Sequence, residues 1–273
     1  MADSDPTAED ACGPGPGTPE GRRAIELLWD PPTPSPGRGP RPKTSLTEVV
    51  DAGVRLADSE GLAALSMRKV ANRLGIGTMS LYTYVPGRSE LIELMIDRVY
   101  ADHARPDPGL GWRARVEQWA RATWATYAAH PWLLDYNMAR LPIGPHVLDV
   151  EESLYSALYA AGFKGAQNTA VANLIRWQLI GAARSTIGDA DEERHTGVSA
   201  EAYWESRASF WETYFDADRF PTMAAVWADG GFDDPAGWDF EQMITRLLDG
   251  IEQLALRARA DLSSAELSSG EPA

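Results

Sequence analysis

The stretch between Ser66 and Ser89 constrains the fold of this chain more than any other part of the sequence. Its first half carries apolar residues at positions i, i+3, i+4 and i+7, which form one face of a short helix: Met67, Val70, Ala71 and Leu74. Gly75 follows at once, where a helix that must stop uses a residue free to adopt a positive φ. A second helix of about two turns is predicted over residues 79–84. Two short helices joined by a tight glycine turn indicate a helix-turn-helix, whose second helix fits the DNA major groove.

The sequence on either side of this stretch supports a compact helical unit. Ser45 and Glu48 have the spacing of a capping box, which predicts the start of a helix. An apolar stripe follows it: Val49, Val50, Ala52, Gly53, Leu56 and Ala57. Another apolar helix is predicted to open at Ser89. The sequence therefore predicts three helices packed as one unit, with a fourth leaving it.

At this point the chain resembles the TetR family of transcriptional regulators. The resemblance is close over roughly residues 45–96, and beyond them it is one of architecture only. The sequence of residues 77–82 and the Trp-rich remainder look most like those of actinomycete antibiotic- and efflux-related repressors. The residues that carry the resemblance are Ala52, Ala57, Gly61, Met67, Val70, Ala71, Leu74, Gly75, Leu81, Tyr82, Tyr84, Leu91 and Leu94.

The resemblance implies an all-α fold with an N-terminal three-helix DNA-binding domain and a larger C-terminal helical bundle. By positional match to the family motif, the residues expected to face DNA bases are Arg68, Thr78, Met79 and Tyr82. Those expected to bind phosphates are Thr44, Ser45, Thr83, Tyr84 and Arg88. Structural interpretations compete with these DNA-binding roles. Arg68 is also interpretable as an ordinary solvent-exposed arginine, and Tyr82 as a residue that packs partly against Leu56. Gly77 departs from the many family members with a polar side chain there, which puts a base contact from that position in doubt.

Charge is distributed unevenly along the chain. The whole protein carries −15, yet residues 38–100 hold nine Lys or Arg and seven Asp or Glu, a balance of +2. Residues 1–37 carry −5 and residues 101–273 carry −12. Affinity for phosphate depends on local basic groups, so the acidic sum does not exclude DNA binding. The acidic remainder is expected to repel DNA and so orient the basic end toward it, and it is equally an ordinary solvated surface.

Breaks in the pattern divide the chain into four predicted parts. Residues 1–43 are expected to be a disordered extension, residues 44–104 the DNA-binding domain, residues 110–261 a helical ligand-binding and dimerisation domain, and residues 262–273 a disordered tail. Within the extension, an apolar patch over residues 22–30 is either a helical turn that docks on the body or without a role.

The Pro-rich end of the extension, residues 31–43, is expected to form a stiff arm. It ends in three basic residues, Arg38, Arg41 and Lys43. The arm is either a plain linker or a segment that enters the DNA minor groove beside the first helix.

The C-terminal part is predicted to be helical, because it shows no alternating strand pattern. The expected helices cover residues 112–130, 132–139, 147–161, 166–188, 200–216 and 239–261. Nine of the ten tryptophans lie after residue 110, which favours a cavity between helices. The residues predicted to line such a ligand pocket are Trp119, Thr123, Tyr127, Asn173 and Trp177; each is also a candidate for ordinary core.

The last predicted helix carries an apolar stripe that includes Ile244, Leu247, Leu248 and Ile251. The family resemblance implies that this helix pairs with its copy in a homodimer, and two recognition helices would together read a palindromic site. The alternative is that the helix only closes its own bundle.

Other kinds of chemistry find no support in the sequence. Cys12 is the only cysteine, so no intramolecular disulfide forms, and no apolar run reaches membrane-spanning length. Of the four histidines, none has metal-ligand spacing, and we expect no metal, no cofactor and no enzyme activity. Residues 189–193 resemble the start of a calcium loop but lack its later ligands, and we interpret them as a solvated loop.

The sequence thus predicts a cytoplasmic, homodimeric, ligand-responsive transcriptional repressor. Its expected partners are double-stranded operator DNA, a small aromatic or polycyclic effector and a second copy of the chain, without a membrane. One alternative is a DNA-binding regulator whose C-terminal domain binds a protein instead of a small ligand. An enzyme with an accessory helix-turn-helix is a third hypothesis, which the missing catalytic residues argue against.

Overall fold

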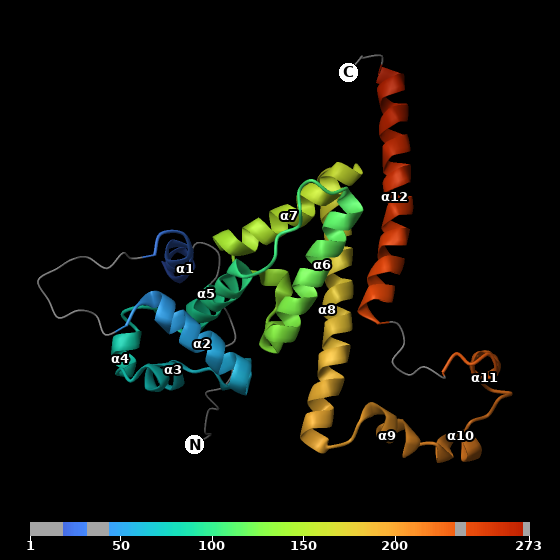
Figure 1. The fold of residues 1–273 in the computed structure, drawn as a ribbon, viewed down its shortest axis with the longest axis horizontal. Coiled ribbons are helices and arrows are strands. Elements are labelled where there is room, and N and C mark those ends of the chain that lie inside the picture. Colours follow the sequence, from blue (N-terminus) through green and yellow to red (C-terminus); the bar gives the residue numbers. More distant parts are fainter. Residues whose placement is uncertain (1–18, 32–43, 233–238, 270–273) are drawn as a thin grey trace, which may run out of the picture. The chain divides into compact units, whose positions relative to one another are not determined.

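The computed structural model describes residues 19–31, 44–232 and 239–269. In these ranges the chain is helical and contains no strand, which confirms the predicted all-α fold (Figure 1). The chain divides into two compact units, with the boundary between Ala157 and Leu158.

The helix-turn-helix forms as the sequence predicts. It consists of α2 (Leu46–Glu60), a 3₁₀ turn η1 (Leu62–Ala64), α3 (Met67–Leu74) and α4 (Thr78–Leu81). The Ser45 side chain accepts from the backbone N–H of Glu48 and the Glu48 carboxylate accepts from the backbone N–H of Ser45, so the capping box is present. Gly75 ends α3 in the left-handed conformation with φ of 66°, which a residue with a side chain rarely adopts.

The second helix of the motif is shorter than the predicted span of residues 79–84. Its α-helical part is α4, and the chain continues as a turn in which Tyr84 N–H and Val85 N–H both donate to the carbonyl of Leu81. Val85 is fully buried, so the turn closes onto the core just before Pro86. The backbone therefore leaves the helical path once Leu81 has been buried.

α5 (Arg88–Ala101) packs along α2 and completes the core of the DNA-binding region. Leu56, Leu91 and Met95 are fully buried there. Gly53 lies where the two helices approach closely, because a Cβ atom at this position would come within 2.7 Å of the Met95 sulfur. The close approach holds the helix-turn-helix firmly on α5.

The rest of the first unit follows α5. It contains α6 (Trp112–Ala129), the 3₁₀ segments η2 (Pro131–Asp135) and η3 (Met138–Arg140), and α7 (Pro145–Ala161), which ends in the second unit. The prediction of one helix over residues 132–139 is wrong, because the chain forms only two short 3₁₀ turns there. Pro142 and Pro145 lie directly beyond and supply no backbone N–H to extend a helix.

The second unit contains two long helices and three short ones. They are α8 (Gly165–Thr196), α9 (Ala200–Glu205), α10 (Ser209–Thr213), α11 (Pro221–Ala228) and α12 (Phe240–Ser269). α8 runs through Gly188 and the acidic residues that follow, so the prediction of a loop at residues 189–193 is wrong. A single interior glycine costs only about 1 kcal/mol, which a long packed helix tolerates. The helix predicted over residues 200–216 is divided into α9 and α10.

Two predictions of disorder are wrong in part. Within the extension, residues 19–29 form α1 (Pro19–Trp29), which packs on α5, so the apolar patch does dock on the body. At the other end, α12 continues to Ser269 and includes most of the predicted tail. The basic arm residues Arg38, Arg41 and Lys43 lie outside the described residues.

Candidate DNA-binding and effector sites

The short recognition helix α4 separates its inner and outer faces sharply. Leu81 is fully buried and anchors the helix on the core, whereas Met79 is 80% exposed and Tyr82 is 42% exposed. Thr78 is half-buried at the start of the helix. Large side chains such as these are usually covered by other parts of the protein. Their exposure leaves them available to contact a large partner such as DNA.

A shallow hollow of about 400 Å³ adjoins this helix, and its wall is mostly backbone and small side chains. Gly77 lines it, and a Cβ atom there would meet only the Ser80 hydroxyl, at 3.8 Å. Gly77 therefore has space for a side chain but supplies none, in line with the doubt about a base contact from this position. The other lining residues are Gly75, Ile76, Ser80, Thr83 and Tyr84.

The basic residues of α3 differ in how far they are neutralised. Lys69 and Arg73 both form ion pairs with Glu60, at 2.8 Å and 3.0 Å. The hydrogen bond from Lys69 is the main cause that lowers the pKa of Glu60, so this carboxylate stays charged. Arg68 is exposed on the same helix. The two ion pairs with Glu60 therefore leave the charge of Arg68 outside this cluster.

Most of the residues predicted to bind phosphate already have hydrogen-bond partners within the protein. The hydroxyls of Thr44 and Ser45 donate to the Glu48 carboxylate, at 3.0 Å and 3.1 Å. The backbone N–H of Ser45 also donates to Glu48 and is the main cause that lowers its pKa. The Thr83 hydroxyl donates to the Ser80 carbonyl at 2.6 Å, and Tyr84 is half-buried.

Arg88 holds the helix-turn-helix together from the first turn of α5. Its Nε donates to the carbonyl of Leu65 at 2.9 Å and its Nη2 to the carbonyl of Leu62 at 2.8 Å. Leu62 and Leu65 lie in the loop between α2 and α3, so Arg88 fixes the entry to α3. A guanidinium has five N–H donors, and those not used here remain available for another acceptor.

Three of the residues predicted for the ligand pocket lie together on the inner face of α6. Trp119 is 2% exposed, and Thr123 and Tyr127 are each 3% exposed. The indole Nε1 of Trp119 donates to the carbonyl of Val150 on α7 at 3.0 Å. Asn173 is half-buried on α8, where its Oδ1 accepts from Nη1 of Arg176 at 2.7 Å.

The prediction that Trp177 faces a pocket is wrong, because this side chain is 67% exposed on α8. Leu174, three positions earlier on α8, is also 41% exposed. The side of α8 that carries Leu174 and Trp177 is therefore exposed and forms an apolar surface.

His103, which no sequence motif singles out as a site residue, lies beside the α6 residues. It is 5% exposed, its ring is stacked on Tyr100, and its Nε2 lies 3.1 Å from the Thr123 hydroxyl. Its other ring nitrogen, Nδ1, is buried and has no hydrogen-bond partner. Burial, followed by the charge of Arg105, lowers the pKa of His103 to about 4, so the ring is neutral at pH 7. The sequence feature that could have pointed to His103 is its position directly after the α5 helix.

Three residues of the stripe on α12 are buried within a single chain. Ile244 and Leu248 are fully buried and Ile251 is 1% exposed, so the prediction that they form the surface between two copies is wrong. Leu247 is half-buried, and Leu254, one turn beyond Ile251, is 41% exposed. The helix therefore closes its own bundle with one side and leaves a second apolar side exposed.

Within the described residues, no three His, Cys, Asp or Glu side chains lie together in a way that would hold a metal ion. No helix in the described ranges combines the length and the apolarity needed to cross a bilayer.

Comparison with known proteins identifies both parts of the chain. Residues 49–95 match the family described as bacterial regulatory proteins, tetR family, and residues 105–255 match the tetracyclin repressor-like C-terminal domain. The chain is 40% identical over 244 residues to the HTH-type transcriptional repressor DrrR1 of Streptomyces coeruleorubidus, and the alignment covers 88% of each protein.

Solved structures show the same fold. Apo ActR from Streptomyces coelicolor aligns with a TM-score of 0.65 at 23% identity, over 80% of this chain and all of that one. ActR in complex with actinorhodin aligns with a TM-score of 0.59 at 24% identity, over 76% and 96% of the two chains. The chain therefore belongs to the TetR family, whose members are transcriptional regulators and not enzymes.

Proposed function

We propose that this protein is a homodimeric repressor that binds a palindromic operator and releases it when a small aromatic or polycyclic molecule binds. The observation that carries the DNA-binding part is α4, where buried Leu81 holds exposed Met79 and Tyr82 outward. An exposed helix of this kind at the end of a helix-turn-helix fits the major groove. Its operator DNA lies in the cytoplasm, where we place the protein.

The proposed contacts divide into two classes. Met79, Tyr82, Thr78 and Arg68 read base edges, which carry sequence information. Thr44, Ser45, Thr83, Tyr84 and Arg88 hold the backbone, which carries none. The arm residues Arg38, Arg41 and Lys43 enter the minor groove next to the first helix of the motif.

The proposed dimer uses the outer apolar surface of the second unit. Leu174 and Trp177 on α8 are exposed, as is Leu254 on α12. Because α8 and α12 pack on each other within the second unit, these side chains belong to one helix pair. A four-helix interface between two copies would cover them and set the spacing of the two recognition helices.

The proposed effector site centres on His103, Trp119, Thr123 and Tyr127. A neutral imidazole with a buried, unpartnered Nδ1 and a neighbouring hydroxyl offers polar atoms among aromatic rings, which suits a flat molecule with oxygen substituents. ActR has been solved with actinorhodin, which supports a small-molecule effector for a protein of this fold. The effector must prefer the state that does not bind operator, and a coupling of about 1–3 kcal/mol suffices.

The experiment that tests this function has two steps. Duplexes selected from random DNA by the full-length protein should contain inverted repeats about one helical turn apart. A panel of aromatic and polycyclic natural products is then screened for tryptophan quenching and for release of the selected duplex. Quenching and release should occur over one concentration range, and operator should weaken effector binding by the same factor. Quenching without release would contradict the effector role.

The exposed aromatic side chains of α9–α11 favour a second candidate, a regulator that answers to a protein partner. Tyr214 is 73% exposed, Trp204 57% and Trp227 47%, which is an unusual apolar surface for a segment of short helices. This candidate predicts that no small molecule in the panel releases DNA. It also predicts that Tyr214→Ser abolishes regulation in cells while operator binding and dimerisation in vitro remain unchanged.

A further inference from the structure

Helix α1 docks on the body through one face. Ala24, Leu27 and Leu28 are at most 8% exposed, and their i, i+3, i+4 spacing places them on one side of the helix. This side packs on α5, the helix that continues from the helix-turn-helix. Ile25, which points to another side, is 46% exposed.

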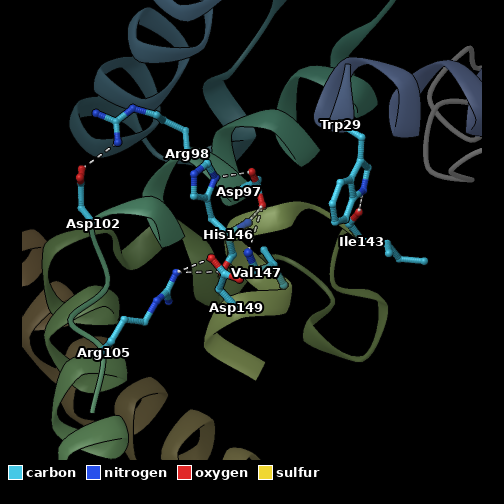
Figure 2. Close-up of polar contacts among 9 residues, drawn as sticks. All are labelled: Trp29, Asp97, Arg98, Asp102, Arg105, Ile143, His146, Val147 and Asp149. Carbon is cyan, nitrogen blue, oxygen red and sulfur yellow. Dashed lines mark hydrogen bonds and ion pairs between the residues drawn. The ribbon is translucent and has the colours of Figure 1, made fainter. Parts of the chain in front are cut away.

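The last residue of α1 reaches a different part of the first unit. The indole Nε1 of Trp29 donates to the backbone carbonyl of Ile143 at 2.7 Å, across 114 positions of sequence (Figure 2). Ile143 lies in the short loop before α7. The same small helix therefore contacts α5 with its apolar face and the start of α7 with its final side chain.

α5 is joined to the start of α7 independently of α1. Asp97 on α5 is 5% exposed, and its Oδ1 accepts from the backbone N–H groups of His146 and Val147, at 2.9 Å and 3.0 Å. Its Oδ2 lies 2.8 Å from Nδ1 of His146 (Figure 2). Gly144 allows this approach, because a Cβ atom there would collide with the carboxylate. A carboxylate at a helix N-terminus also interacts favourably with the helix dipole.

The three elements thus form a closed set of contacts: α1 with α5, α5 with α7, and α7 with α1. We propose that α1 is a built-in clamp that fixes the start of α7 on α5 and thereby stabilises the operator-binding position of the helix-turn-helix. The link to operator binding rests on the proposed function.

The test uses three variants of the full-length protein. Leu28→Asp places a charge in the docked face, Trp29→Phe removes only the N–H that reaches Ile143, and Ile25→Asp is the matched control on the exposed side. Amide hydrogen exchange is measured over residues 88–101 and 141–150. Affinity for a duplex selected by the wild-type protein is measured by fluorescence anisotropy.

We expect exchange over residues 141–150 to rise at least tenfold in Leu28→Asp and less in Trp29→Phe, with no change in Ile25→Asp. Operator affinity should fall severalfold in the same order. Because linkage is reciprocal, the duplex should slow exchange within α1 of the wild type. Circular dichroism checks that Leu28→Asp remains helical. If Leu28→Asp unfolds, the milder Trp29→Phe variant still tests the clamp.

Two results would overturn the clamp. One is exchange in Leu28→Asp and Trp29→Phe that equals exchange in Ile25→Asp. The other is faster exchange with unchanged operator affinity, which would make α1 a purely structural element. A wild-type protein that selects no duplex would instead contradict the proposed function, while the exchange measurement would still report on docking.

Discussion

Oδ1 of Asp58 accepts a 2.7 Å hydrogen bond from Nε1 of Trp132, which ties α2 of the helix-turn-helix to the segment after α6. Nδ1 of His130 lies 2.7 Å from the same oxygen. Asp58 and Asp97 are therefore carboxylates on two helices of the DNA-binding region: Asp58 holds the segment directly after α6, and Asp97 holds the first turn of α7. These two links give the DNA-binding region a defined position within the first unit.

Replacing Asp58 should show how much the link between Asp58 and Trp132 contributes to the free energy of unfolding. Asp58→Ala leaves the Trp132 N–H without its partner in a partly buried place, so we expect a loss of about 1–3 kcal/mol in the free energy of unfolding. Asp51→Ala is the matched control on the same helix, because the half-exposed pair of Asp51 with Arg98 should contribute less than about 1 kcal/mol. Urea unfolding measures both, and equal losses would contradict a special role for Asp58.

The DNA contacts should separate into reading and positioning. Tyr82→Ala should weaken binding to the selected operator by about 1–3 kcal/mol and leave binding to a random duplex nearly unchanged. Arg88→Ala should weaken binding to both duplexes, because it removes the proposed phosphate contact and also releases the carbonyls of Leu62 and Leu65. Anisotropy titrations on the two duplexes test this, and parallel losses in both variants would show that the roles are wrongly assigned.

The basic arm should contribute through charge. Replacing Arg38, Arg41 and Lys43 with Ala leaves α1 in place, which deletion of the whole extension would not. If all three bind phosphates, the slope of log affinity against log salt should become shallower by about 2–3. A titration series from low to physiological salt gives the slope, and an unchanged slope would make the arm a linker.

Local signals explain why the DNA-binding region was predictable from the sequence. The Ser45–Glu48 capping box and the left-handed Gly75 each act within a few residues, so the chain reveals them without tertiary information. Met79 was assigned to the DNA side by its match to the family motif, and its exposure beside buried Leu81 agrees with two positions lying on nearly opposite sides of a helix. The shorter recognition helix escaped prediction, since it ends where Val85 is pulled into a core built by distant helices.

Features that depend on tertiary packing were harder to predict. Trp177 looked like a pocket residue because aromatic side chains usually face inward, and only the packing of α8 shows that this side is open. His103 carries no motif, and its burial depends on α6, which begins after the next loop. Leu248 belongs to a stripe broad enough for two roles, and the sequence does not divide that stripe between core and interface.

The second unit offers a direct test of the proposed dimer surface. Trp177→Asp adds a charge to an exposed position, so the chain should stay folded while sedimentation shows monomers and operator binding is lost. Leu248→Asp buries the charge instead and should unfold the chain, because an unpaired buried charge costs several kcal/mol. A folded dimer in Trp177→Asp would place the interface elsewhere.

The buried histidine should make the protein sensitive to acid. The pKa of His103 is lowered to about 4 by burial, whereas in the unfolded chain it lies near 6.5. Below pH 6.5 the unfolded state therefore binds a proton that the folded state does not bind. The contribution of neutral His103 to the free energy of unfolding is fully present above this pH and is lost as the pH falls toward 4. Each pH unit within this window removes about 1.4 kcal/mol.

His103→Gln removes the titrating group but keeps a side chain able to meet the Thr123 hydroxyl. Between pH 8 and pH 5 the free energy of unfolding should fall by about 2 kcal/mol more in the wild type than in this variant. Urea unfolding at both pH values measures the difference. His146→Gln is the control, because the His146 side chain is 45% exposed and His103 keeps its buried place in this variant. An equal fall in the wild type and His103→Gln would mean that His103 is already solvated in the folded protein, and the effector site proposed around it would lose its polar centre.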